Sequence, residues 1–163
     1  MRKTRFVIMV AVCLLTTAIY VWAETRKAGL WETTTTMIWQ QSPLPGGTPP
    51  PGSGQPHTTQ ACITQQQFEK YGAIIPQVPG CQVTNVVVKS QSMSADMVCS
   101  GKMAGKATLE SSWSDDSHAI GSIHFVGSIQ VGADNKTIEW TSHSTSVFKN
   151  TDCGSVKPAA PPQ

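Results

Sequence analysis

The chain has 163 residues, enough for one domain, with 12 Lys and Arg against 10 Asp and Glu and a formal net charge of +2. Three of those cations are Arg2, Lys3 and Arg5, so the rest of the chain is close to neutral. Binding to nucleic-acid phosphates needs several Lys or Arg side chains on one face. The charge balance therefore argues against nucleic acid as a partner.

Residues 1–23 have the pattern of a signal peptide. A basic start is followed by an apolar run over residues 6–22, and Val21 and Ala23 supply small residues at positions −3 and −1 of a cleavage site. The alternative is an uncleaved anchor, although the run is near the lower length limit for a membrane span. We expect cleavage after Ala23, a periplasmic or secreted protein, and no transmembrane anchor in the mature chain.

Residues 24–157 are predicted to form a single disulfide-bonded β domain. A Thr-rich first strand covers residues 29–40, and a second strand covers residues 57–62. Between them, residues 42–56 contain six prolines and four glycines, which cannot pair in a sheet, so we expect an exposed loop. The Pro- and Ala-rich tail, residues 158–163, is expected to be disordered.

A short helix is predicted directly after the second strand. Thr64 is a favourable N-cap, and Gln67 three residues later completes a capping box. Ile63 before the cap and Phe68 after it have the spacing of a hydrophobic staple. Gly72 is expected to end the helix.

From Cys81 onward, apolar residues alternate with polar ones in several segments separated by turns at residues 114–117 and 133–135. Alternation of this kind indicates antiparallel strands with one buried face. The predicted fold is mainly β, a curved antiparallel meander of about seven strands with one short helix packed on it.

Four cysteines remain after the signal peptide, and the nearest two are 18 residues apart, without a C-x-x-C motif. Zinc sites and redox centres need closer pairs, whereas an exported chain with four cysteines favours disulfides. Placing Cys81 opposite Cys99 in a hairpin also places Val83 opposite Met97, Asn85 opposite Ala95 and Val87 opposite Met93, so the apolar faces coincide except at Asn85. The predicted pairs are Cys81–Cys99 and, by elimination, Cys62–Cys153.

No catalytic, cofactor-binding or metal-binding residue is predicted. His118 and His124 lie on the polar face of one strand, too far apart for a shared metal. Asp115 and Asp116 fit a turn, where aspartate bonds locally. Met37, Met93, Met97 and Met103 invite a copper interpretation, but three of them lie on the apolar face of adjacent strands, which favours core packing.

Short motifs along the mature chain resemble a bacterial family of small exported proteins catalogued only as a domain of unknown function. They begin with Gly29-Leu30-Trp31-Glu32 and end with Asp152-Cys153-Gly154-Ser155-Val156-Lys157-Pro158, with the other three cysteines and their neighbours in order between them. The resemblance implies a periplasmic, disulfide-bonded β protein. It brings no known activity, so no residue roles are carried over.

The functional hypothesis is a non-catalytic protein that binds an apolar small molecule or an envelope partner through its apolar sheet face. That face would include Met97, Met103, Leu109, Ile123, Phe125 and Trp140. One short helix is too small to cover all of it, and an uncovered apolar surface is a binding surface. The alternatives are a sheet that curls on itself and fills its own interior, a hydrolase-type enzyme whose site is not visible in the sequence, and a structural or metal-buffering protein.

Overall fold

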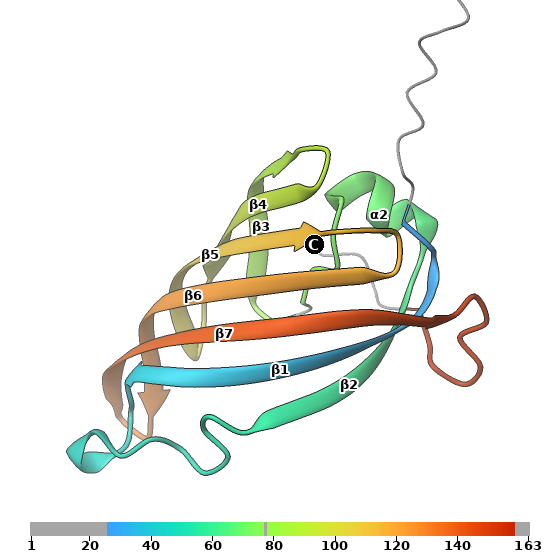
Figure 1. Ribbon diagram of the computed structural model, residues 1–163. Helices are drawn as coiled ribbons and strands as arrows, with labels where there is room; N and C mark the ends of the chain where they lie inside the picture. Colours follow the sequence, from blue (N-terminus) through green and yellow to red (C-terminus); the bar gives the residue numbers. More distant parts are fainter. Residues whose placement is uncertain (1–25, 77, 159–163) are drawn as a thin grey trace, which may run out of the picture.

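The computed structural model describes residues 26–76 and 78–158, so the predicted signal peptide and residues 159–163 lie outside it. Seven strands form one antiparallel sheet in the order β2-β1-β7-β6-β5-β4-β3 (Figure 1). This confirms the predicted fold class. The strands are β1 (Gly29–Gln41), β2 (Pro56–Ile63), β3 (Cys81–Val88), β4 (Ser92–Cys99), β5 (Met103–Trp113), β6 (His118–Val131) and β7 (Asp134–Asn150).

The sheet has two edges, β2 and β3, and the chain joins them through the helix α2 (Gln65–Tyr71) and the segment that follows it. Figure 1 shows the sheet curling so that β3 and β4 turn behind β5 and β6. Residues 42–55 leave the sheet between β1 and β2 and contain a short 3-10 turn, η2 (Pro45–Gly47), whereas Pro56, expected in the loop, is the first residue of β2 and pairs with Thr36. The exposed position of the loop follows from its composition, because proline cannot donate to a strand ladder.

The helix has the ends that its sequence predicts. The hydroxyl of Thr64 accepts a hydrogen bond from the backbone N–H of Gln67 at 3.3 Å, and the side chain of Gln67 accepts one from the backbone N–H of Thr64 at 2.8 Å. Gly72 takes the left-handed conformation and ends the helix. Phe68 packs with Ile63 and Trp31 in a small apolar cluster, which fixes α2 against the sheet.

The apolar face of the sheet holds the main core. Phe125 is fully buried and stacks on Trp140, with ring centroids 5.3 Å apart. Beside Phe125, Gly105 of β5 and Gly127 of β6 face each other, and a Cβ atom on either glycine would lie 2.8 Å from the Phe125 ring. The glycine pair therefore lets the ring lie flat across two strands, where the sheet needs a close approach.

One expected strand register is wrong beyond Asp96. Cys81 faces Cys99 and Val83 faces Met97 as predicted, but a β-bulge follows and Val87 faces Ser94 instead of Met93. Asn85 adopts a positive φ of 52° there, and its amide donates to the Asp96 carboxylate at 2.8 Å. The extra residue turns Val87 away from the core, where it is 50% exposed, and brings Val86 onto the core in its place.

The last hairpin turns earlier than expected. Val131 faces Asp134, so the loop consists of Gly132 and Ala133, whereas the sequence suggested residues 133–135. Gly132 has a φ of 64°, a conformation that glycine adopts at little cost, and this permits the tight two-residue loop. As a result, β7 gains two residues at its start.

Two disulfides fasten opposite ends of the apolar face, and they are the two pairs expected from the sequence. Cys81–Cys99 joins neighbouring strands at the end that carries Gly105, and Cys62–Cys153 joins the end of β2 to the segment after β7. Pro158, the first residue of the predicted tail, forms an isolated bridge with Cys62. Within residues 26–158, apart from residue 77, no helix has the length and apolar character needed to cross a membrane.

Candidate functional site

A cavity of about 460 Å³ lies over the apolar face, between the strands and the segment that follows α2. Ile74, Ile75, Pro76 and Val78 of that segment form one wall. The opposite walls come from β1, β2, β4, β5, β6 and β7, so almost the whole sheet contributes. The apolar face is therefore covered by a short segment without being filled.

The cavity exists because small side chains occupy the middle of β7 on this face. Ser142, Ser144 and Ser146 follow one another at alternate positions, between the large rings of Trp140 and Phe148. Two of these serines also face small residues across the sheet. Ser144 faces Gly121 on β6, and Ser146 faces Ala119 on β6 and Thr33 on β1. Large side chains at both ends and small ones between them leave a hollow.

Hydroxyl groups form part of the cavity floor. The hydroxyls of Thr33 and Ser146 are hydrogen-bonded to each other at 2.8 Å, and the Ser144 hydroxyl donates to the Gly121 carbonyl at 3.4 Å. These bonds satisfy polar atoms that are otherwise costly to bury. The cavity thus combines aliphatic and aromatic walls with a floor of satisfied hydroxyls.

Four of the six residues proposed for the ligand face line the cavity: Met97, Leu109, Ile123 and Trp140. Phe125 is fully buried in the packed core, and Met103 packs against the same core outside the cavity lining. Sequence reasoning missed the serines at positions 142, 144 and 146. Their signal was present as a run of small residues at alternate positions, flanked by Trp140 and Phe148.

Arg26 is a second feature that the sequence reasoning missed. Its guanidinium lies between two rings, with Cζ 3.4 Å from the Trp113 centroid and 5.0 Å from the Phe68 centroid. Arg26 is only 7% exposed, and burial lowers its pKa to about 10, which leaves it charged at neutral pH. Its Nη1 atom has no hydrogen-bond partner among the residues that the structure describes.

The residues around Arg26 hold it in this position. The backbone N–H of Lys27 donates to the Asp116 carbonyl at 3.3 Å, and the Lys27 ammonium lies 2.9 Å from the Asp116 carboxylate. The Lys27 carbonyl accepts a hydrogen bond from the indole of Trp31 at 2.9 Å. The turn that carries Asp116 and the indole of Trp31 in β1 thus hold the backbone of residues 26–27 against the end of the sheet.

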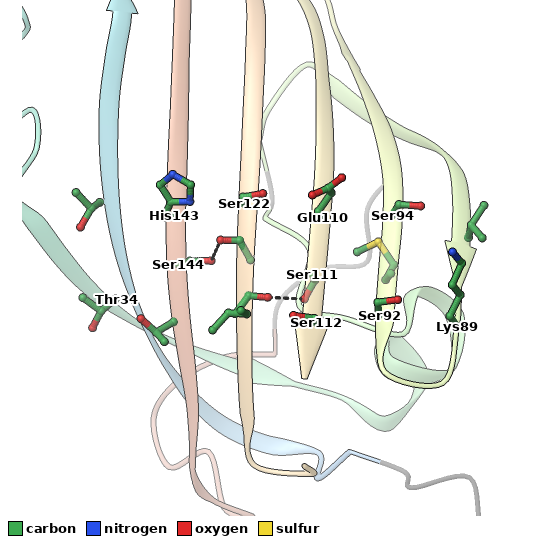
Figure 2. A pocket seen from close by; sticks show the side chains of 16 residues that line it. Thr34, Lys89, Ser92, Ser94, Glu110, Ser111, Ser112, Ser122, His143 and Ser144 are labelled. Atoms are coloured by element: carbon green, nitrogen blue, oxygen red, sulfur yellow. Dashed lines mark hydrogen bonds between the residues drawn. The ribbon is translucent and has the colours of Figure 1, made fainter. Parts of the chain in front are cut away.

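The opposite, polar face of the sheet carries a shallower trough of about 770 Å³ (Figure 2). His143, Ser122, Glu110 and Ser94 follow one another across β7, β6, β5 and β4. Figure 2 shows them in one row across the strands. Lys89, Ser92 and Thr34 line the trough near its ends.

This row lacks the geometry of a hydrolytic triad. A Ser-His-acid triad places histidine between the nucleophile and the carboxylate, whereas Ser122 here lies between His143 and Glu110. No side-chain hydrogen bond joins any two of these three residues. The row is a polar sheet surface with mixed side chains.

The other ionisable groups form local pairs on the surface. Asp115 accepts a hydrogen bond from the Ser117 backbone at 2.7 Å and lies 3.0 Å from His118, and these contacts hold the pKa of its carboxyl well below the ordinary value. His124 pairs with Glu139 at 3.0 Å. Among the described residues, no group of three His, Cys, Asp or Glu side chains is placed to hold a metal ion. Met93 and Met97 are buried in the core, as their alternation predicts.

These features define a class: a disulfide-bonded protein of one curved antiparallel sheet, with a partly hydroxylated apolar cavity beside the segment that follows a short helix. The chain belongs to the family described as "Protein of unknown function (DUF3617)", which matches residues 26–153. This confirms the family resemblance seen in the sequence motifs. Comparison with curated proteins and with solved structures found no match.

Proposed function

We propose that the protein is an exported, non-catalytic binder of an apolar small molecule, which it holds in the cavity over the apolar face. The single observation that carries the proposal is the hollow itself. Its volume of about 460 Å³ lies within the usual range for small-molecule sites, and its walls are mainly apolar. A few fixed polar groups within an apolar cavity are the usual arrangement for orienting a ligand.

The proposed location is the periplasm or the exterior of the cell. Two disulfides in a chain of this size fit an oxidising compartment, because cytosolic thiols are kept reduced. The basic start and apolar run of residues 1–23 are a second argument for export. Intact mass of the exported protein is expected to lack those residues. A full-length, membrane-bound species would contradict cleavage.

The binding proposal is tested with Nile red, an uncharged apolar dye, added to protein purified after export of the full chain. Ser142 is 5% exposed and lines the cavity, so Ser142→Leu places a larger side chain into the hollow. We expect saturable binding to the wild type and a loss of about tenfold or more in Ser142→Leu, because the added side chain occupies the ligand's volume.

His143→Leu is the matched control. It introduces the same side chain at the next position of β7, which faces the polar trough. We expect Nile red binding to this variant at the wild-type level. Binding lost in His143→Leu and retained in Ser142→Leu would move the site to the trough. Folded wild-type protein without saturable binding would refute the proposal.

Turnover assays distinguish a binder from an enzyme. We expect no hydrolysis of generic ester, phosphate or glycoside substrates above background. Reproducible turnover that disappears in Ser122→Ala or His143→Ala would replace the binding proposal with a hydrolase acting in the polar trough.

A further inference from the structure

The position of Arg26 specifies the kind of molecule that suits the cavity. We infer that the ligand is a single-chain amphiphile with a carboxylate head group, its aliphatic chain in the cavity and its carboxylate on the Arg26 guanidinium. This inference rests on the proposed binding function and adds the chemical class of the ligand.

Arg26 does not itself line the cavity, but both rings on which its guanidinium lies are next to residues that do. The ring of Trp113, on which its guanidinium stacks, faces Ala119 across the sheet, and Ala119 lines the cavity. The second ring, Phe68, packs in the cluster that includes Ile63, another lining residue. The Trp113 and Phe68 rings and the lining residues next to them therefore separate the guanidinium from the cavity, and the head group must pass between them to reach it.

The two rings leave the edge of the guanidinium for hydrogen bonds. Stacking uses the flat faces of the group, whereas its N–H donors lie in the plane between those faces. Nη1 is buried and unpaired within residues 26–158, residue 77 excepted. An unpaired buried donor on a charged group costs free energy, and an anion bound at that edge removes the cost.

Acidic side chains near Trp113 in the sequence do not fill this role. Asp116 is paired with Lys27 at 2.9 Å, and Asp115 is bonded to Ser117 and His118. No ion pair involves Arg26 among the described residues. Among the described residues, the guanidinium is thus a buried cation without an anion partner.

A single unpaired cation favours a singly charged head group. Lys27 is the nearest other cation along the chain, and it is already neutralised by Asp116. A phosphate monoester carries close to two charges at neutral pH and needs more than one cation, whereas a carboxylate matches one guanidinium in charge and in its two parallel oxygens. The cavity adjoining this site is mainly apolar, which suits an aliphatic chain.

Isothermal titration calorimetry tests the inference with decanoate, decan-1-ol and decyltrimethylammonium, each below its micelle-forming concentration. We expect decanoate to bind the wild type about tenfold or more tightly than decan-1-ol, because a hydrogen bond to a charged group is worth that much. Decyltrimethylammonium is expected to bind most weakly. Acetate binding as tightly as decanoate would overturn the role of the chain.

Variants of Arg26 locate the effect. Arg26→Gln is expected to lose the preference for decanoate over decan-1-ol, and Arg26→Lys to keep part of it. Lys149→Gln is the control, because it removes one cation from a surface pair with Glu32 away from the Arg26 rings. Equal decanoate affinity in the wild type and Arg26→Gln would refute the inference.

A measurement on the wild type covers the case in which Arg26→Gln does not fold. Decanoate labelled with carbon-13 at its carboxyl reports its own titration when bound. A guanidinium partner is expected to lower the carboxyl pKa relative to free decanoate, whereas burial without a cation raises it. A raised or unchanged pKa would refute the inference.

The two proposals fail in different ways. If no probe binds the wild type, both the binding function and the ligand class fail. If decan-1-ol binds, is blocked by Ser142→Leu, and decanoate binds no more tightly, the binding function stands and the carboxylate inference fails.

Discussion

The packed end and the hollow middle of the apolar face differ although the same strands build both. At the packed end, Phe125 stacks on Trp140, and Ala107 lies opposite Phe125 in the next strand. In the middle, Ser142 and Ser144 occupy the same face of β7 and leave a cavity. Alternation decides which side chains point inward, whereas their sizes decide whether the space between layers is filled.

Removing each disulfide compares the two ends of this face. Cys62–Cys153 closes 91 residues and Cys81–Cys99 closes 18, so the chain-entropy argument gives losses of about 4.6 and about 3.2 kcal/mol respectively. We expect the Cys62→Ala/Cys153→Ala variant to have the lower free energy of unfolding in urea titrations. The reverse order would show that the short link holds the packed end more firmly than loop closure predicts.

Phe125→Ala tests the packed end directly. Phe125 is fully buried, so truncation leaves a void and is expected to cost about 3–5 kcal/mol of unfolding free energy. Val126→Ala is the neighbouring control on the exposed face, where Val126 is 47% exposed, with an expected cost of about 1 kcal/mol or less. Equal losses in chemical denaturation would contradict the distinction between the faces.

Leucine introduced at the packed end and in the hollow middle compares the two regions directly. Ala107→Leu adds volume beside Phe125 and is expected to destabilise by about 1–3 kcal/mol through overpacking. Ser142→Leu adds volume to the hollow, and we expect a change within about 1 kcal/mol of the wild type. Thermal unfolding of both variants measures the difference, and a large loss in Ser142→Leu would mean that the middle is not hollow in solution.

The smallest effect is expected at the turn that fixes Lys27. Hydrogen bonding to Ser117, with His118 next to it, lowers the pKa of Asp115 below its ordinary 3.8, so the folded state favours the charged form. Its contribution is present above about pH 4 and is lost as the pH falls below that value. Asp115→Asn is expected to flatten the fall in Tm between pH 5 and pH 3. An unchanged pH profile would show that this exposed carboxylate does not contribute.

Much of the fold could be predicted from local patterns. Alternation located the strands after Cys81, and the capping residues at Thr64 and Gly72 located the helix. The bulge at Asn85 could not be predicted by assuming a constant register, because an αL residue bonded to Asp96 inserts one position. The last turn begins one residue earlier than predicted, because Gly132 has a positive φ that permits a two-residue loop with Ala133.

The site was predicted less completely, because it depends on contacts between distant residues. Met97, Leu109, Ile123 and Trp140 were found through alternation, which reports a face. The cavity depends on Ser144 lying opposite Gly121, and Arg26 on rings from positions 68 and 113. Residues 26, 68 and 113 come into contact only in the curled sheet, so their spacing in the sequence does not predict the contact.

The pairing of β1 with β7 also affects how the protein is made. This ladder joins residues about a hundred positions apart, whereas β3 to β7 pair with their neighbours in sequence. Contacts between distant residues form slowly, because the intervening chain must first be closed into a loop. We therefore expect the β3–β7 meander to form as an early folding intermediate. The β1–β2 hairpin is expected to pair with β7 only after β7 is available.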